Sequence, residues 1–357
     1  MKQTNMDLKT AIRQANGIVI VGHYNPDGDA VGSTMGLKYL LANMGKAADV
    51  IYPNAYAQNL KWMDPDGSVL IYNGNTAKCQ ALIARADLIF CLDFQALGRT
   101  DAMTQPLTES RAFKVLIDHH IGPALNEFDL CFSETAVSST CEKLYQTIAA
   151  ELDVALVDKR VASCLYAGIC TDTGSFSYAC RHAGLFRIVA ELIDRGADTV
   201  RIHRAIFDTF SASRMYLLGY CLHKKLVVMP EYGTAYISLD IEEMERFHYQ
   251  AGDLEGVVNY ALGIEGVSFA AFFTQRQNRI RVSLRSKGEV DVNEFARQHF
   301  NGGGHKNAAG GSAFESLSET LARFERLVPD FYTHEIQPKR AALPPILRYE
   351  NKGMAVH

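Results

Sequence analysis

The chain has 357 residues, of which 48% are hydrophobic and 21% charged, and its formal net charge is -4. This length and composition allow a full hydrophobic core and leave room for two domains. The slightly acidic balance excludes a protein that coats long nucleic acid, since such binding needs many Lys and Arg residues to neutralise phosphates. No apolar run approaches the roughly 20 residues of a membrane-spanning helix, so we expect a cytoplasmic protein without a membrane partner.

The first half of the sequence alternates short β-type runs with helical stretches. The expected strands cover residues 17–22, 47–52, 88–93 and 112–118, and the expected helices cover 33–44, 77–86 and 135–152. Strands that alternate with helices need crossover connections, and this predicts an α/β domain with a mostly parallel, doubly wound sheet. A helical stretch without β alternation follows, from about residue 158 to 225.

Near residue 226 the pattern changes to strands separated by turns and helices. The expected strands cover residues 226–229, 234–239, 267–274 and 279–284. They predict a second, smaller α/β domain, with the boundary in the helical connector.

Metal-binding residue types follow three of the expected strands. His23, Asp27 and Asp29 come after the first run, Asp93 ends another, and residues 118–120 read Asp-His-His. In open parallel sheets, ligands collect outside the carboxyl ends of the strands. The sequence therefore predicts a metal centre at this edge of the sheet.

The segment 23–33 is the least specific of these motifs when taken alone. Pro26 and Gly28 favour a tight turn, which would let the three acidic and imidazole side chains converge. A calcium-type loop or a plain surface turn would give the same pattern. The other clusters favour the metal centre over both alternatives.

Asp172, in the segment Thr-Asp-Thr-Gly, adds a further donor and makes the set large enough for two ions. Carboxylates with a minority of imidazoles and no thiolate favour Mn²⁺ or Mg²⁺ over structural zinc. Two such ions about 3.5–4 Å apart activate a water and clamp both oxygens of an in-line phosphoryl displacement. The predicted reaction is the hydrolysis of a phosphoester.

The second domain carries a basic strip and a glycine-rich run. Residues 276–287 include five basic residues and no acid, and with period two Arg279, Arg281 and Arg285 share one face of a strand. Residues 302–311 contain three consecutive glycines followed by His305, so backbone N–H groups can approach an anion closely. A solvated edge and a flexible linker are the alternatives; we predict a phosphate-binding loop.

Together these motifs resemble the DHH phosphoesterase family with its DHH-associated C-terminal domain. The residues that carry the resemblance are the His-x-Asn-Pro-Asp-Gly-Asp-Ala loop from residue 23, Asp93, Asp-His-His at 118–120, Thr-Asp-Thr-Gly at 171–174 and Gly-Gly-Gly-His at 302–305. The resemblance extends to about residue 333 and is strongest to the nanoRNase and 3′-phosphoadenosine 5′-phosphate (pAp) phosphatase branch.

The resemblance implies a DHH catalytic domain at 1–190, a helical connector at 191–225 and a DHH-associated substrate-binding domain at 226–335. The proline, lysine and arginine residues of 336–357 predict an extended basic tail. It also implies an active site in the cleft between the two domains. A site of that kind limits the length of the substrate.

The resemblance assigns metal ligands residue by residue. One ion would be bound by His23, Asp27 and Asp93, and the other by Asp29, Asp93, His119 and Asp172, so that Asp93 bridges them. His120 would lie beside the scissile phosphate and assist the leaving oxygen, while Asp118 would orient the histidines.

The resemblance also implies substrate contacts. The positions are Arg285, Ser286, Gly303, Gly304 and His305, with Arg99 as a weaker candidate. Many relatives carry a basic residue at the position of Ser177, so substrate contacts near Ser177 differ from the family pattern.

The expected function is hydrolysis of short oligoribonucleotides (nanoRNA), of pAp, or of both, to mononucleotides, with two Mn²⁺ ions or with Mg²⁺ and without a covalent intermediate. Long duplex nucleic acid is not an expected partner, and a homodimer is left open. A cyclic- or linear-dinucleotide phosphodiesterase would use the same residues. An inorganic pyrophosphatase would not need the glycine-histidine run, and a non-enzymatic nucleotide-binding regulator would not need a complete ligand set.

Overall fold

A computed structural model describes residues 6–177, 180, 182–250 and 252–340. The chain forms two compact units, the first ending at Phe210 and the second beginning at Ser211. This division falls inside the segment 191–225, where we expected the connector. Most of the expected basic tail, residues 341–357, lies outside the described residues, and the short helix α14 (Gln337–Arg340) precedes it.

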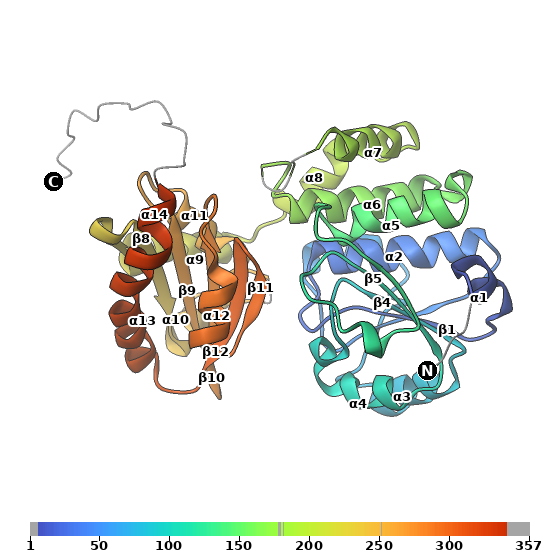
Figure 1. The fold of residues 1–357 in the computed structure, drawn as a ribbon, viewed down its shortest axis with the longest axis horizontal. Helices are drawn as coiled ribbons and strands as arrows, with labels where there is room; N and C mark the ends of the chain where they lie inside the picture. The colour runs from blue at the N-terminus through green and yellow to red at the C-terminus, as the bar shows by residue number, and fades with distance from the viewer. Residues whose placement is uncertain (1–5, 178–179, 181, 251, 341–357) are drawn as a thin grey trace. The chain divides into compact units, whose positions relative to one another are not determined.

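The first unit is built on a six-stranded parallel sheet with the order β3-β2-β1-β4-β5-β6 (Figure 1). Its strands are β1 (Ile18–Val21), β2 (Asp49–Tyr52), β3 (Leu70–Ile71), β4 (Leu88–Leu92), β5 (Phe113–Asp118) and β6 (Leu130–Ser133). Every residue of β1 and β4 is buried, as is typical of parallel strands covered on both faces. The parallel doubly wound sheet predicted from the sequence is confirmed.

Helices cover both faces of this sheet. They are α1 (Leu8–Gln14), α2 (Gly28–Asn43), α3 (Thr76–Arg85), α4 (Thr104–Glu109), α5 (Thr140–Glu151) and α6 (Lys159–Asp172), with 3-10 turns η1 (Gln58–Met63), η2 (Leu97–Met103), η3 (Leu125–Glu127) and η4 (Val154–Leu156). Two more helices, α7 (Ala183–Asp194) and α8 (Thr199–Phe207), pack against α6. Ile20 and Phe90 pack in a cluster with residues of α2, α5 and α6, and Val19 and Ile89 pack in a second cluster with residues of α3 and α4. The two helical layers lie on opposite sides of the sheet in Figure 1.

The second unit contains a mixed six-stranded sheet with the order β11-β12-β10-β9-β8-β7, in which only β8 and β9 pair in parallel. Its strands are β7 (Leu226–Met229), β8 (Thr234–Leu239), β9 (Phe269–Arg276), β10 (Arg279–Ser286), β11 (Gly303–His305) and β12 (Ala308–Ala313). Its helices are α9 (Ala212–Tyr220), α10 (Ile241–Arg246), α11 (Val257–Leu262), α12 (Val292–His299), α13 (Leu317–Phe331) and α14, with the turns η5 (Cys221–Lys225), η6 (Pro230–Tyr232) and η7 (Tyr332–Ile336). This is the second α/β unit that the sequence predicted.

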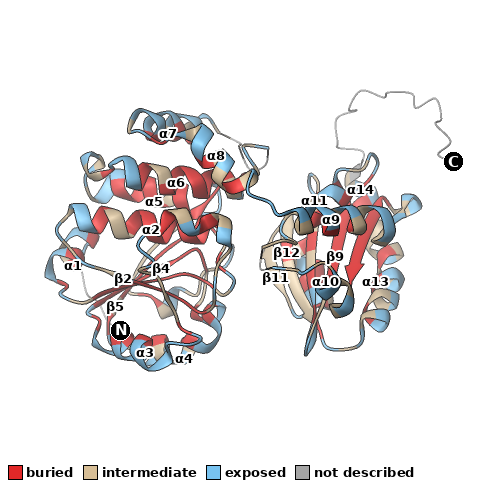
Figure 2. Ribbon diagram, turned by 180° about the vertical axis from the view of Figure 1, so that it is seen from behind, coloured by how far each residue is buried: buried red, intermediate tan, exposed pale blue. Residues whose placement is uncertain are grey.

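The two faces of strand β10 differ in burial. Ile280, Val282 and Leu284 are buried in a cluster with α12 and α13, whereas Arg279 and Arg281, which alternate with them, are exposed. Figure 2 shows β11 and β12 mostly at intermediate burial and β9, on the other side of β10, mostly buried. The predicted strand with one packed face and one basic face is confirmed.

The glycine-rich run 302–311 is a pair of short strands, β11 and β12, and the prediction of a loop was wrong. The glycines are needed because the backbones approach closely: a Cβ at Gly302 would lie 2.0 Å from the carbonyl oxygen of Gly310. Gly304 has φ 149°, and its Cβ would lie 2.5 Å from the carbonyl oxygen of Ala308. The run thus permits tight strand pairing.

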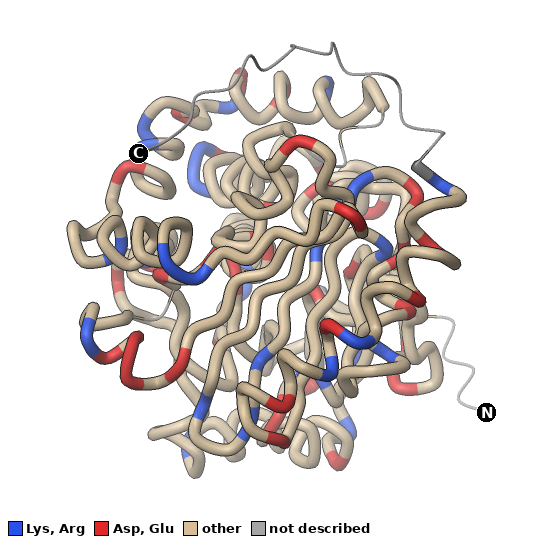
Figure 3. Tube along the Cα trace, turned by 90° about the vertical axis from the view of Figure 1, so that its left-hand side faces the viewer, with Lys and Arg blue, Asp and Glu red and all other residues tan. Residues whose placement is uncertain are grey.

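Acidic and basic residues are interspersed along the chain (Figure 3), in keeping with the small net charge. Among the described residues, none of the helices combines the length and the apolar composition needed to cross a membrane.

Candidate metal centre

The candidate metal centre lies at the carboxyl ends of three neighbouring strands of the first unit. β4 pairs in parallel with both β1 and β5, so the three strands end at the same edge of the sheet. His23 follows β1, Asp93 follows β4, and Asp118 is the last residue of β5. The sequence order alone therefore brings the three motifs together.

The loop after β1 is shorter than the sequence suggested. Helix α2 begins at Gly28 rather than near residue 33, and Asp27 is its N-cap, with Oδ1 accepting hydrogen bonds from the N–H groups of Asp29 and Ala30 at 3.1 Å. Asp29 lies in the first helical turn, so the expectation that the helix begins at residue 33 was wrong. A capping aspartate followed by Asp29 still points both carboxylates at the strand ends.

Close packing of α2 against α6 sets the position of the remaining acidic ligand candidate, Asp172, at the end of α6. A Cβ on Gly28 would lie 2.3 Å from Oγ1 of Thr171, and a Cβ on Gly168 would lie 2.8 Å from Oδ1 of Asp29. Neither contact is sterically allowed, so glycine at both positions is what lets the two helices come this near.

The predicted ligand residues form two groups that share Asp93. Nε2 of His23 lies 3.4 Å from Asp93 Oδ2 and 3.8 Å from Asp27 Oδ1. In the second group, Nε2 of His119 lies 3.7 Å from Asp93 Oδ1, 3.9 Å from Asp29 Oδ2 and 3.4 Å from Asp172 Oδ2. The structure thus brings together all six residues predicted as ligands. Five of them form clusters whose ligand atoms lie within 4.8 Å of one another, and Asp172 lies beside His119.

Two backbone features orient this donor set. Nδ1 of His23 lies 2.9 Å from the carbonyl oxygen of Tyr24. If Nδ1–H donates there, Nε2 keeps its lone pair for a metal. Asp93 has φ 67°, a left-handed conformation that is strained for a non-glycine residue and typical of functional positions.

Buried carboxylates in this cluster repel one another. Burial, together with repulsion from Asp172, raises the pKa of Asp29 to about 6. Burial and repulsion from Asp29 raise the pKa of Asp93 well above its ordinary value. Burial alone would lower the pKa of His23, but hydrogen bonds to Asp27 and Asp93 raise it well above its ordinary value. A site with this much concentrated negative charge suits divalent cations with oxygen and imidazole ligands, so the residues present fit the predicted metals.

His120 lies against Asp118, and its Nδ1 is also 3.9 Å from Asp93 Oδ1. Nδ1 of His120 and Oδ1 of Asp118 lie 2.7 Å apart, and Asp118 is fully buried. The other oxygen of Asp118, Oδ2, has no hydrogen-bond partner among the described residues. Burial lowers the pKa of His120 despite the opposing effect of Asp118. The hydrogen bond to Asp118 orients the imidazole.

The start of helix α5 contacts the metal centre, a role that no motif in the sequence indicated. Thr140 donates from Oγ1 to Asp93 Oδ1 at 2.8 Å and from its backbone N–H to Asp29 Oδ2 at 2.6 Å. The backbone N–H of Cys141 donates to Asp29 Oδ1 at 2.9 Å. The N-terminus of α5 therefore stabilises the Asp29 carboxylate. The Ser-Ser-Thr run at 138–140 is a helix-start signal in the sequence, but nothing local to it indicates its target.

The predicted substrate contacts fall in both units. The side chain of Arg99 is exposed, and its carbonyl oxygen accepts a hydrogen bond from the N–H of Tyr24 at 2.8 Å, next to His23. In the second unit, Ala308 pairs with both Arg285 and His305, so these two side chains share a row and a face of the sheet. They are two strands apart, which separates their backbones by about 10 Å.

The other named positions in the second unit have structural contacts. Ser286 is buried on the opposite face, donates to the carbonyl oxygen of Val290 at 2.7 Å, and lies 2.9 Å from Asn307 Nδ2. The N–H of Gly304 donates to Asn293 Oδ1 at 2.9 Å. Gly303 shares the face of His305.

Two domain families match the chain. The family described as "DHH family, N-terminal domain" matches residues 17–169, and the DHHA1 domain matches residues 233–330. The crystal structure of an exopolyphosphatase-related protein from Bacteroides fragilis is 38% identical in sequence, superposes with a TM-score of 0.86, and the match covers 91% of this chain and 95% of that one.

The chain belongs to the DHH family. The resemblance predicted from the motifs is thereby confirmed, and the chain is a phosphoesterase, a hydrolase of phosphate esters.

Two curated proteins share this DHH architecture over nearly their whole length. The probable bifunctional oligoribonuclease and PAP phosphatase NrnA of Streptococcus mutans is 29% identical over 320 residues, covering 88% of this chain and 95% of that protein. The bifunctional oligoribonuclease and PAP phosphatase NrnA of Bacillus subtilis is 27% identical over 314 residues, covering 87% and 94%.

Proposed function

We propose that this protein hydrolyses short oligoribonucleotides and pAp to mononucleotides. The observation that carries the proposal is the pair of His and Asp groups that share Asp93 at the ends of β1, β4 and β5. The names of the Streptococcus mutans and Bacillus subtilis relatives, which join both activities in one protein, support it. A cytoplasmic location remains a prediction.

We propose two divalent ions in this site, Mn²⁺ or in its place Mg²⁺. The residues that would hold them are His23, Asp27 and Asp93 for one ion and Asp29, Asp93, His119 and Asp172 for the other. When bound, the ions supply positive charge that stabilises the phosphoryl oxygens and acidify the attacking water. Asp93, buried and shared by both groups, would fix their spacing.

The protein's own residues would do the proton transfer and the positioning. Asp118 accepts from Nδ1 of His120 and so stabilises the protonated imidazole, which can donate a proton from Nε2 to the leaving oxygen. Thr140 holds the Asp93 carboxylate in place. Burial raises the pKa of Cys141, next to the site, well above its ordinary value. A thiol in that state is a poor nucleophile, which supports hydrolysis without a covalent intermediate.

Arg285 and His305 would hold the part of the substrate that does not react. They share one row of the second sheet, and a cation and an imidazole on one face can contact one phosphate and its nucleoside. The burial of Ser286 favours a supporting role, in which it fixes Asn307 behind this row. Arg99, exposed beside the His23 loop, is a further phosphate contact in this proposal.

A dinucleotide phosphodiesterase is the second candidate. The cyclic-di-AMP phosphodiesterase GdpP of Bacillus subtilis is 25% identical over 354 residues, covering 92% of this chain and 50% of that protein. The same metal-binding residues would serve that reaction, so the two candidates differ only in what the second unit holds.

A single panel of substrates tests the proposal. Purified protein with Mn²⁺ is incubated with pAp, di- to pentaribonucleotides, cyclic di-AMP and pyrophosphate, and products are separated by chromatography. We expect mononucleotides from the oligonucleotides and AMP with phosphate from pAp. Selective cleavage of cyclic di-AMP would replace the proposal with the second candidate, and hydrolysis of pyrophosphate alone would contradict both.

A further inference from the structure

The second unit has a pocket at the hairpin end of β9, away from Arg285 along the sheet. Its volume is about 440 Å³, and it is lined by α10, the segment after it, and the end of β9. The lining includes an aromatic ring, an imidazole, amides, a carboxylate and a guanidinium, contributed by Tyr249, His248, Gln250, Gln275, Glu245 and Arg276. A mixed polar and aromatic lining of this kind suits a flat heteroaromatic group.

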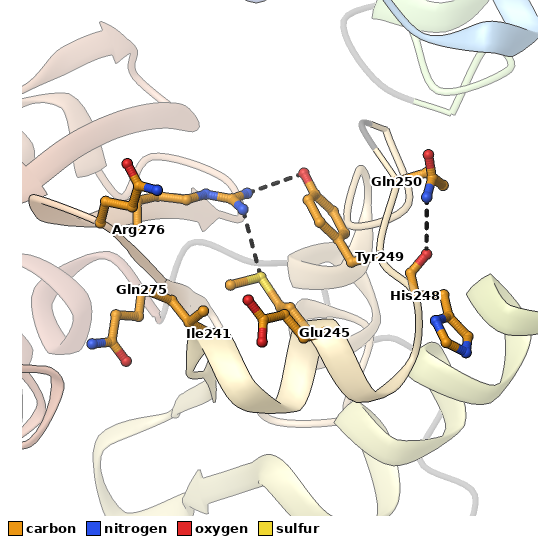
Figure 4. Close-up of a pocket in the computed structure, with 9 residues that line it drawn as sticks. Ile241, Glu245, His248, Tyr249, Gln250, Gln275 and Arg276 are labelled. Atoms are coloured by element: carbon orange, nitrogen blue, oxygen red, sulfur yellow. Dashed lines mark hydrogen bonds between the residues drawn. The ribbon is translucent and has the colours of Figure 1, made fainter.

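Arg276 is held in this pocket by a tyrosine ring and a methionine sulfur, and neither of these partners carries a negative charge. Its guanidinium carbon lies 4.9 Å from the ring centroid of Tyr249, and its Nη2 donates a hydrogen bond to Tyr249 Oη at 3.1 Å (Figure 4). Its Nη1 lies 3.6 Å from Met244 Sδ. Among the salt bridges of the described residues, none includes Arg276. A guanidinium held against an aromatic ring can contact a phosphate while the ring stacks on a base.

A row of basic side chains connects this pocket to Arg285. Arg276 pairs directly with Arg279 across the hairpin, and Arg281, Ser283 and Arg285 follow on the same face of β10. Arg279 is exposed. Partial burial lowers the pKa of the Arg281 guanidinium, and the like charge of Arg276 lowers it further. From Arg279 to Arg285 the strand advances six residues, or about 20 Å, which accommodates the backbone of a few nucleotides.

The neighbouring strand leaves room beside this row. The residues of β12 that face the same way as the arginines are Ala308, Gly310 and Ser312, which pair with Arg285, Ser283 and Arg281. All three have small side chains, so a chain laid along β10 meets no bulky side chain from β12. Like charges placed directly opposite one another, as in the pair Arg276 and Arg279, destabilise a sheet unless an anion compensates them.

We propose that this pocket binds the nucleobase at the far end of a short oligonucleotide whose reacting end is held at Arg285 and His305. This inference rests on the function proposed above, and it adds the feature that sets the preferred length of the oligonucleotide substrate. Tyr249 stacks on the base, Arg276 and Arg279 contact the adjacent phosphate, and Arg281 contacts a phosphate along the row. pAp, with a single nucleoside, does not reach the pocket.

The test compares kcat/KM for pAp and for a pentaribonucleotide in the full-length wild-type protein and in the variants Tyr249→Ala and Arg276→Ala. We expect kcat/KM for the pentanucleotide to fall about fivefold or more, the low end for loss of one base stack, and kcat/KM for pAp to stay within twofold. Arg326→Ala, which removes an exposed arginine from α13 in the same unit, is the matched control and should change neither substrate.

Two further comparisons keep the test decisive. Tyr249→Phe keeps the ring and should retain most of the pentanucleotide activity. A pentanucleotide with an abasic residue at the end remote from cleavage should behave alike with wild type and Tyr249→Ala. Equal pentanucleotide activity in Tyr249→Ala and wild type would overturn the inference while leaving the proposed function intact. Equal losses on pAp and on the pentanucleotide would also overturn it, because the residues would then act on the whole fold or on catalysis. A wild-type protein inactive on both substrates would instead contradict the proposed function itself.

Discussion

Oγ1 of Thr140 donates a hydrogen bond to Oδ1 of Asp93 at 2.8 Å, which ties the start of α5 to the residue shared by both metal-binding groups. Thr140 is fully buried and Asp93 is 2% exposed, so neither group can exchange this bond for one to bulk water. Thr140 is therefore a positioning residue for the carboxylate that both ions would use.

The Thr140→Val substitution removes this hydroxyl and keeps the shape of the side chain. We expect Mn²⁺ affinity to fall about 10- to 100-fold, as is typical when a metal ligand loses an outer hydrogen bond. Isothermal titration calorimetry with Mn²⁺ measures this affinity. The control is Thr147→Val in the same helix, whose hydroxyl donates only to the carbonyl oxygen of Lys143, and it should bind Mn²⁺ normally. Unchanged affinity in Thr140→Val would rule out the positioning role.

The Gly168→Ala substitution should damage the metal site from a distance. The new methyl group would lie 2.2 Å from Sγ of Cys141 and 2.8 Å from Oδ1 of Asp29, so α6 must move away from both α5 and α2. We expect destabilisation of about 1–3 kcal/mol and less bound Mn²⁺, measured by denaturant unfolding and elemental analysis. The matched variant Gly219→Ala in α9 places its methyl group in open space. It should leave the stability and the Mn²⁺ content unchanged or slightly improved. A Gly168→Ala protein with normal stability and full metal content would contradict the packing argument.

The stability of the metal-free protein should fall as the pH rises. The pKa of Asp29 is raised in the folded state, from 3.8 to about 6, so the folded chain binds this proton more tightly than the unfolded chain does. The resulting stabilisation is complete below pH 3.8 and is lost as the pH rises through about 6. With a chelator present, the melting temperature should be lower at pH 7.5 than at pH 5. Added Mn²⁺ should reverse the order, because it binds the ionised carboxylates. A metal-free protein that melts higher at pH 7.5 would be at odds with the buried carboxylate cluster.

Substrate preference should stop rising with length beyond a few nucleotides. A short basic row can neutralise only a few phosphates, so the slope of log kcat/KM against log salt should stay shallow, at about 0.7 per phosphate contacted on a single strand. Steady-state assays on oligoribonucleotides of increasing length, at several salt concentrations, measure the length dependence and the salt dependence of kcat/KM. A continuing rise beyond about ten nucleotides with a steep salt slope, as a long phosphate tract gives, would indicate a processive exonuclease instead.

The parallel sheet and the ligand set could be predicted from the sequence because their signals are local. Buried strands read as apolar runs, and His23, Asp93 and Asp118 each stand at the end of one. The edge strands β3 and β6 were missed because they are short and only half-buried, so their runs carry little hydrophobic signal.

Other features depended on contacts between distant parts of the chain. The role of Thr140 comes from a hydrogen bond across 47 positions to Asp93. The glycines at 302–304 were interpreted as a phosphate-binding loop, whereas the approach of β11 to β12 is what requires them.

The central claim is that Asp93 serves two ions in one phosphoester-hydrolysing site. The most direct measurement is the rate of phosphate release from pAp by wild type and by Asp93→Ala, each first stripped of metal and then supplied with increasing Mn²⁺. We expect wild type to be inactive when stripped and to recover fully, and Asp93→Ala to lose more activity than a variant at any other single ligand, because both ions lose a donor at once. Full activity of Asp93→Ala without added metal would contradict the account.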